Sequence, residues 1–317
     1  MNRGMEKFFS SNSMMRATLS LAALVIATTL LPAQNAGRAG AFARIGFGAR
    51  GIGMGNGMTA MTAGEISAYY NPALSAFSER RTASASFGIL SFDRSLNFLS
   101  YTQSIKPTAG LSFTVINAGV SNIDGRDGDG VHTEDYSTFE NQFSLSFSNL
   151  VSDRVALGAA IKLYHSKLFE KITSTTVGFD IGICVKATDA LTVGAAVIDF
   201  NSKYKWTTED KFPNLRKLAV AYALPVGGAM VSAEIENSSE QTTIFRFGAE
   251  YPVMENFTLR AGLDRLESGS DATGAKPTFG FSAKNSFNGW TPSLHYAFVV
   301  EAFAPHGMHI ITLSAAL

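Results

Sequence analysis

The 317-residue chain has one cysteine, few charged residues and, beyond Leu31, no long apolar run. A single cysteine, Cys184, excludes an intramolecular disulfide, and its position far from the N-terminus excludes an N-terminal lipid anchor. Charged residues form 16% of the chain, below the roughly 25% of soluble domains. The 26 basic and 26 acidic residues cancel, so nothing indicates a nucleic-acid partner. The missing apolar runs exclude a bundle of spanning helices, each of which needs ~20 residues.

The first 39 residues have the organisation of a secretory signal peptide. Arg16 supplies the positive charge, 17–31 form the apolar stretch, and small residues follow it. A membrane anchor is the alternative, but the apolar run is short for a spanning helix. We expect export, with cleavage between Ala33 and Ala43.

From residue 80 to 317 the chain reads as a series of alternating segments of about ten residues. A membrane-spanning strand needs ~9–11 tilted residues with apolar and polar positions alternating. We predict an all-β fold, a 14-stranded antiparallel transmembrane barrel. A soluble β-sandwich is the alternative, but it has no reason to sort its loops by length. The predicted strands are 81–90, 95–105, 108–118, 137–148, 154–166, 171–186, 190–200, 214–224, 228–237, 242–251, 256–266, 276–287, 290–300 and 308–317.

Several segments separate apolar from charged residues by face. Phe245 and Phe247 alternate with Arg246, for example. A charge facing lipid near the midplane costs ~2–4 kcal/mol, so the charged face is predicted to line the lumen. Lone buried charges are expensive, which implies a wet or ion-paired lumen. Segments 95–105 and 190–200 are ambiguous in phase. The predicted polar ladder of the lumen is Lys217, Glu234, Arg246, Glu250, Arg260, Asp264 and His295.

The connections are predicted to differ in length at the two ends of the barrel. Long ones are expected at 119–136, 201–213 and 267–276, and tight ones at 149–153, 188–189, 225–228, 252–256 and 288–289. If both chain ends lie in the periplasm, the long connections face outward. Three aromatic residues in the connection after the seventh strand are predicted to make extracellular contacts, either as part of an aromatic belt or as a landing surface for a ligand or partner: Tyr204, Trp206 and Phe212.

Residues 40–79 form a glycine-rich segment unlike anything later in the chain. Glycine permits positive φ and close backbone packing, and irregular backbone at membrane depth must be enclosed by protein. The segment is therefore predicted to fold inside the lumen as a hatch, ahead of a barrel domain at 80–317. The predicted hatch residues are Gly46, Gly48, Gly51, Gly53, Gly55, Tyr69, Tyr70, Asn71, Pro72 and Ala73.

Three motifs suggest other chemistry and are better explained by the barrel. The string from Gly46 to Gly51 matches a dinucleotide fingerprint but lacks a βαβ context. Asp124, Asp127 and Asp129 resemble a calcium loop, yet Val131 stands where an oxygen ligand is needed. The five histidines form no close metal pair, and no catalytic triad spacing is present. We therefore expect no metal, no cofactor and no enzymatic activity.

The segment 41–74 carries a family resemblance. The strings Ala41-Phe42-Ala43-Arg44-Ile45-Gly46-Phe47-Gly48 and Tyr69-Tyr70-Asn71-Pro72-Ala73 resemble the PorV/PorQ family, a branch of the FadL-type outer-membrane transporters. Leu74 stands where a glycine commonly follows, and paired upstream acidic residues are reduced to Glu65. The resemblance implies a fourteen-stranded barrel with an internal hatch. It also implies either type IX protein secretion, as for PorV and PorQ, or uptake of long-chain fatty acids, as for FadL.

The expected location is the bacterial outer membrane. Transport or protein handling is the first hypothesis, with secreted proteins bearing a C-terminal sorting domain as partners. The alternative is a FadL-like channel for hydrophobic small molecules, and a structural or adhesive barrel comes third. The final strand, 308–317, alternates to the last position and is expected to be presented to the barrel-assembly machinery. Outer-membrane lipid is the remaining expected partner.

Overall fold

The computed structural model describes residues 39–168, 172–207, 211–213, 217–238, 243–268, 275–301 and 304–317. The predicted signal peptide and its cleavage region fall mostly outside this range. Among the described residues, no helix has the length and apolar character that crossing a membrane in helical form requires.

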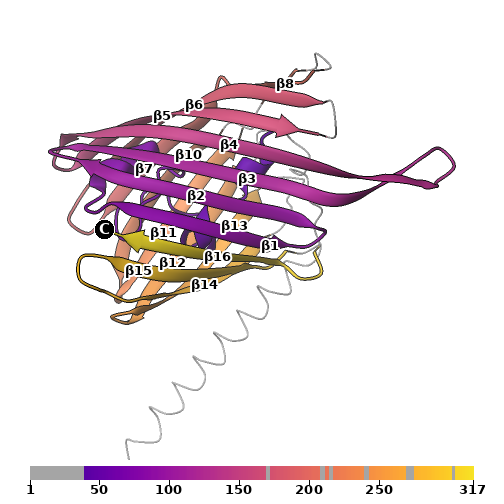
Figure 1. Ribbon diagram of the computed structural model, residues 1–317. Coiled ribbons are helices and arrows are strands. Elements are labelled where there is room, and N and C mark those ends of the chain that lie inside the picture. The colour runs from indigo at the N-terminus through magenta and orange to yellow at the C-terminus, as the bar shows by residue number, and fades with distance from the viewer. Residues whose placement is uncertain are drawn as a thin grey trace, which may run out of the picture.

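Within the described residues, fourteen strands form one closed antiparallel barrel, as the alternating pattern predicted (Figure 1). Each strand pairs with its neighbour in the chain, and β1 pairs with β16 to close the cylinder. β8 (Lys203–Lys205) and β9 (Lys211–Pro213) form a separate two-stranded sheet. The barrel strands are β1 (Thr82–Leu90), β2 (Arg94–Ile105), β3 (Ala109–Arg126), β4 (His132–Ser152), β5 (Val155–Lys167), β6 (Thr173–Lys186), β7 (Thr192–Phe200), β10 (Lys217–Val226), β11 (Ala229–Ser238), β12 (Thr243–Met254), β13 (Phe257–Ser268), β14 (Lys276–Lys284), β15 (Thr291–Val299) and β16 (Met308–Ala316).

The longest predicted loop, 119–136, is mostly strand. β3 and β4 continue pairing as far as Arg126 and His132, with register shifts after Val120 and after Asp124. Such bulges add twist without ending the pairing, so the two strands project beyond the barrel as a hairpin (Figure 1). We call this end of the barrel the hairpin end. The opposite end, which holds the start of β1 and the C-terminus, is the tight-turn end. A smaller correction concerns predicted strand 276–287, which stops at Lys284.

The outer surface of the barrel carries an apolar band. On β4, Phe143, Leu145 and Phe147 point outward and are exposed, while the residues between them are buried. The outward positions from Phe143 to Val151 span about 20 Å along the barrel axis, at ~3.3 Å per residue and a tilt of ~40°. This height on one strand is somewhat below the ~25 Å apolar band of outer-membrane barrels. The outer face therefore suits hydrocarbon contact.

A polar row lies above this band on three neighbouring strands. Asn117 donates from Nδ2 to Asn141 Oδ1 over 2.7 Å and accepts from Asn97 Nδ2 at 3.4 Å. The three residues are aligned partners across β2, β3 and β4. These amides face outward and form a polar row within the hairpin side of the outer surface.

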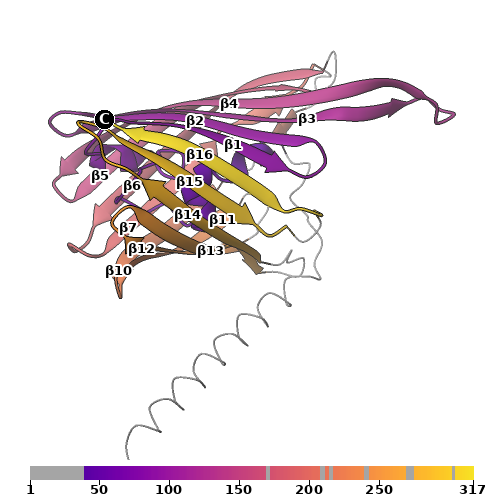
Figure 2. The ribbon, with the colours of Figure 1, turned by 60° about the horizontal axis from the view of Figure 1, so that its bottom comes forward.

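The N-terminal segment lies against the inner wall of the barrel. It contains η1 (Ala41–Arg44), α2 (Gly48–Gly53) and η2 (Pro72–Phe77), and nearly all of its residues are buried. Both views place these indigo elements within the cage of strands (Figures 1 and 2). The wall admits the segment's backbone because several strands present glycine inward, and a Cβ there would approach a segment backbone or side-chain atom to 2.0–2.4 Å: Gly110, Gly158, Gly182, Gly194, Gly248 and Gly262.

The interior differs between the two ends of the barrel. Toward the hairpin end, Leu96, Phe98 and Ile310 point inward and pack with Phe42 and Phe47 of the segment in one buried apolar cluster. Toward the tight-turn end the inward positions of β1–β4 and β16 are hydroxyl-bearing, and they include Ser100, Thr102, Ser112, Ser146, Ser148 and Ser314. Along this part of the wall the lumen is thus apolar toward the hairpin end and polar toward the tight-turn end.

Candidate functional site in the barrel lumen

The first polar contact between segment and wall joins α2 to β12 and β13. Arg50 Nε and Nη2 donate to the two oxygens of Glu250 over 2.9 and 2.8 Å. Arg260 Nε donates to the same carboxylate over 2.7 Å, and its Nη2 donates to Ser282 Oγ over 3.1 Å. Arg50 also donates to the backbone carbonyl of Glu65 over 2.5 Å. One wall carboxylate therefore serves a wall arginine and a segment arginine together.

The second contact is built around Arg246, in the predicted polar ladder. Its guanidinium pairs with Asp264 at 2.7 Å, with Glu234 at 3.5 Å and closely with Glu236. Two atoms of the segment complete the cluster: Asn56 Nδ2 donates to Asp264 over 3.1 Å, and the Thr59 backbone N–H donates to Glu234 over 3.2 Å. Three carboxylates thus surround one guanidinium, and two of them, Asp264 and Glu234, also accept hydrogen bonds from the segment.

A third cluster was not predicted from the sequence. Lys162 pairs with Asp180 at 2.7 Å and with Asp199 at 3.2 Å, and all three side chains are about 1% exposed. Tyr164 donates to Asp199 over 2.5 Å, and Arg44 of the segment forms an ion pair with the same carboxylate. The inward phase of predicted strand 154–166 was a signal for Lys162. No pattern in the sequence indicated Asp199, because the inward direction of its carboxylate depends on a positive φ of 56° near the end of β7.

The fourth contact involves Glu65 and the wall near β15 and β16. His295 Nε2 lies 3.0 Å from Glu65 Oε1, and Ser314 Oγ donates closely to the same oxygen. His295 was predicted to belong to the polar ladder. Its partner Glu65 is the single acidic residue at the place where the family resemblance implied a pair. The segment is therefore tied to the wall on several sides.

Hydrogen bonds within the segment hold its two halves together. Tyr69 O–H donates to the Ala43 carbonyl over 2.7 Å, and Tyr70 O–H donates to Asn56 Oδ1 over 2.7 Å. Tyr70 approaches so near that a Cβ at Gly51 would lie 2.1 Å from its hydroxyl oxygen. Glycine at this position is therefore required by the close approach of the ring.

Asn71 connects the segment to β6 as well as to itself. Its Oδ1 accepts from the Ala73 N–H over 3.0 Å and caps η2, which begins with Pro72. Its Nδ2 donates to the carbonyls of Thr59 and of Ile183, each over 3.0 Å. Three hydrogen bonds therefore hold the side-chain amide of Asn71, which is fully buried.

The predicted extracellular aromatic contacts need correction. Tyr204 is 1% exposed rather than on an outer surface: its ring packs edge-on against Tyr164 at 6.0 Å and its hydroxyl accepts from Ser166 over 3.1 Å. The β8–β9 sheet folds this residue inward. Trp206 is half-buried against Tyr204 at 5.5 Å. The side chains of Phe212 and of the predicted ladder residue Lys217 lie outside the described residues.

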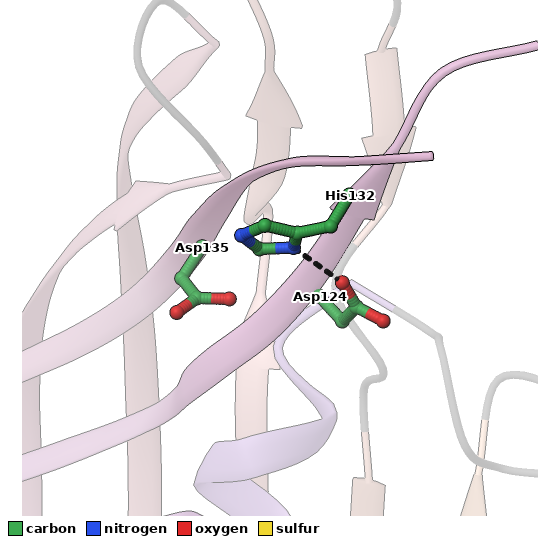
Figure 3. A group of neighbouring side chains, drawn as sticks. All are labelled: Asp124, His132 and Asp135. Atoms are coloured by element: carbon green, nitrogen blue, oxygen red, sulfur yellow. Dashed lines mark hydrogen bonds and ion pairs between the residues drawn. The ribbon is translucent and has the colours of Figure 1, made fainter. Parts of the chain in front are cut away.

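At the hairpin, beyond the barrel wall, three side chains that are metal ligands elsewhere come together (Figure 3). Asp124, His132 and Asp135 each place one ligand atom within 4.8 Å of the others. His132 Nδ1 lies 2.7 Å from one oxygen of Asp124, and Arg126 donates to the other oxygen over 2.7 Å. The charge of Asp124 is therefore already compensated by its neighbours.

These contacts shift the acid–base behaviour of the hairpin. The pKa of Asp124 is lowered, first by the hydrogen bond with His132 and then by that from Arg126. The pKa of His132 is raised, chiefly by the same hydrogen bond with Asp124. Both groups are exposed, so the pair reports on hairpin geometry rather than on overall stability.

Comparison with known proteins gives a likeness of structure without a likeness of sequence. No protein-family model and no curated protein matches the sequence. The toluene transporter TodX of Pseudomonas putida superposes with a TM-score of 0.61 at 13% identity, covering 86% of this chain and 96% of that one. The toluene transporter TbuX of Ralstonia pickettii gives 0.61 at 14%, over 86% and 98%. A FadL homologue of Pseudomonas aeruginosa gives 0.58 at 13%, over 85% and 98%.

The likeness bears on the fold alone, because the identities are low. It agrees with the FadL-type architecture that the sequence resemblance implied, whereas the narrower PorV/PorQ assignment stays a prediction. The chain thus combines a barrel of the fold seen in these transporters with an N-terminal segment that is packed against the inner wall.

Proposed function

We propose that the protein is a passive channel for hydrophobic small molecules in the bacterial outer membrane, with residues 40–79 as its hatch. The observation that carries this proposal is the N-terminal segment packed inside a barrel whose fold is shared with hydrocarbon transporters over 86% of the chain. An open porin has a water-filled lumen that passes polar solutes. A lumen filled by a protein segment has no such water path, which favours a different kind of cargo. This was the alternative hypothesis from the sequence, and it now ranks first. Catalysis has no part in it.

The interior supports capture beside β2, in the apolar cluster around Phe47. There Phe47 stacks on Tyr69 at 5.2 Å and packs against Phe98 of the wall at 5.0 Å. An apolar molecule that displaces Phe47 meets wall residues already suited to apolar contact, so little polar surface is left unpaired. Toward the tight-turn end, the hydroxyl groups on the inner face of β1–β4 and β16 would hold such a molecule only weakly. Passage in this scheme requires the hatch to shift.

The test is uptake of labelled toluene by cells that express the chain and lack other FadL-type channels. We expect faster accumulation than in cells without the protein, together with little swelling of proteoliposomes in small sugars. Swelling as rapid as that given by an open porin would contradict the hatch. Uptake equal to the control, with folded protein present in the outer membrane, would contradict the channel.

Protein handling of the PorV/PorQ type is the second candidate. It is favoured by the string from Tyr69 to Ala73 and by the β3–β4 hairpin, whose exposed tip would be available to a secreted domain. Shortening the hairpin by residues 121–136 separates the two functions. Loss of cargo attachment with unchanged toluene uptake supports protein handling, whereas unchanged attachment removes the hairpin from consideration.

A further inference from the structure

An apolar groove of about 910 Å³ lies on the outer face of the barrel. Its lining residues lie over the seam where β1 pairs with β16 and on the strands beside this seam. Figure 2 shows β1 and β16 side by side, with β2 and β15 next to them. Its floor is made of Ala83 and Ala85 of β1 with Leu313 and Ala315 of β16. Its walls are Leu99 and Phe113 on one side and Leu294 on the other. The groove is separate from the lumen site, and what crosses the lumen has no bearing on it.

The groove exists because of a local change in side-chain size. Toward the hairpin end, β1 presents Phe87 and Ile89 outward, and both are more than half exposed. Toward the tight-turn end, the outward positions of the same strand are Ala83 and Ala85, and neighbouring β16 contributes Ala315. Outward alanines also occur on other strands, but here three of them lie together beside Leu313 of β16, which faces Ala85 across the seam.

Two cations stand at the tight-turn end of the groove. Lys284 lines it directly. Arg80 donates from Nη1 to Thr291 Oγ1 over 3.1 Å, which places its guanidinium next to groove residues Trp290 and Pro292. Neither cation forms an ion pair with any described carboxylate, the C-terminal one of Leu317 included. An apolar groove that ends at two uncompensated cations is complementary to a chain-like apolar molecule with an anionic head.

We propose that the groove binds one glycerophospholipid, with an acyl chain over the groove floor and the phosphate between Arg80 and Lys284. A guanidinium presents paired donors that match phosphate oxygens, and an ammonium adds a point charge. Trp290 lies where indole rings favour the boundary between hydrocarbon and headgroups. The tight-turn end holds the chain's C-terminus, so the lipid belongs to the leaflet on that side. Bound lipid fills the seam that closes the barrel.

Native mass spectrometry of the folded full barrel in mild detergent tests the proposal. The protein is titrated with phosphatidylglycerol, or with a diacylglycerol of the same chains that lacks the phosphate. We expect one phosphatidylglycerol to bind first and most tightly. The double variant Arg80→Gln, Lys284→Gln weakens phosphatidylglycerol binding about tenfold and leaves diacylglycerol binding unchanged. Ala85→Leu, which fills the floor, weakens both lipids.

Matched controls separate the groove from the rest of the surface. Arg154→Gln removes a cation at another tight turn, and Ala159→Leu enlarges an exposed outward alanine on β5; both should bind lipid as the natural chain does. Migration of the unheated barrel on SDS gels shows whether each variant folds. Equal binding of phosphatidylglycerol by the double variant and the natural chain overturns the proposal. So does a dimer that Ala85→Leu dissociates, because the groove would then be an interface between copies.

Discussion

Replacing Arg50 by methionine is the most direct test of the hatch. Arg50 donates two hydrogen bonds to Glu250 and one to the Glu65 carbonyl, and methionine keeps much of its volume without the charge. Removing one partner of a buried ion pair costs about 3–5 kcal/mol. Because Glu250 keeps its hydrogen bond from Arg260, we take the lower end of this energy range. About 3 kcal/mol raises the population of a displaced segment roughly a hundredfold, at ~1.4 kcal/mol per factor of ten.

The assay is single-channel conductance in planar bilayers, with thermal unfolding followed by circular dichroism. The Arg50→Met barrel should open far more often than the natural protein, while its β-sheet unfolds at nearly the same temperature. Arg154→Met is the matched control, because Arg154 pairs with Asp189 at 2.7 Å on the exposed surface and such pairs contribute about 0–1 kcal/mol. A folded Arg50→Met barrel that conducts like the natural one would refute the reasoning.

Three further perturbations follow from the same contacts. Gly262→Ala should expel the segment and raise conductance, because the new Cβ meets a segment backbone nitrogen at 2.2 Å and overpacking costs about 1–3 kcal/mol. Asn71→Ala removes a cap worth ~1 kcal/mol and should speed maleimide labelling of Cys184, which is buried against the segment. Asp124→Asn should lower the pKa of His132, measured by NMR of the imidazole. The raised pKa of His132 and the lowered pKa of Asp124 keep their pair at mildly acidic pH; it is lost when pH rises above the His132 pKa or falls below that of Asp124.

Two of these variants have a neutral counterpart. Gly128→Ala adds a Cβ that meets nothing within 4 Å, so it should conduct as the natural protein does. Asp129→Asn changes the same hairpin without touching His132 and should leave its titration alone. Unchanged conductance in Gly262→Ala, unchanged labelling in Asn71→Ala, or an unshifted His132 pKa would each contradict the contact concerned.

Much of the wall could be predicted because the outward and inward positions alternate along each strand. The clean segments, such as the one containing Phe247 and Arg246, have one face toward lipid and the other toward charged partners. Segments 95–105 and 190–200 were ambiguous for a physical reason now visible. Leu96, Phe98 and Ile198 point inward and are buried there, so both faces of these strands are apolar. The filled lumen thus removed the contrast on which phase prediction depends.

The connection predicted at 119–136 shows a second limit of prediction from sequence. Asp124 to Asp135 read as a loop because glycines and charges interrupt the apolar pattern, yet the strands stay paired there. Beyond the apolar band no side needs to face hydrocarbon, so alternation no longer reports on backbone pairing. Tyr204 was misplaced for a related reason, since a three-residue strand carries too few positions to show a period.

By itself the sequence determined the number of barrel strands, their order and, in the cleanly alternating segments, the face that each side chain takes, because these follow from a period of two within short stretches. Only the tertiary structure decided which charges pair. Arg50 and Glu250 are separated by 200 positions, and Arg44 meets Asp199 across the lumen. Such partners come together only once β1 has paired with β16 and the cylinder encloses the segment, and no local pattern encodes that closure.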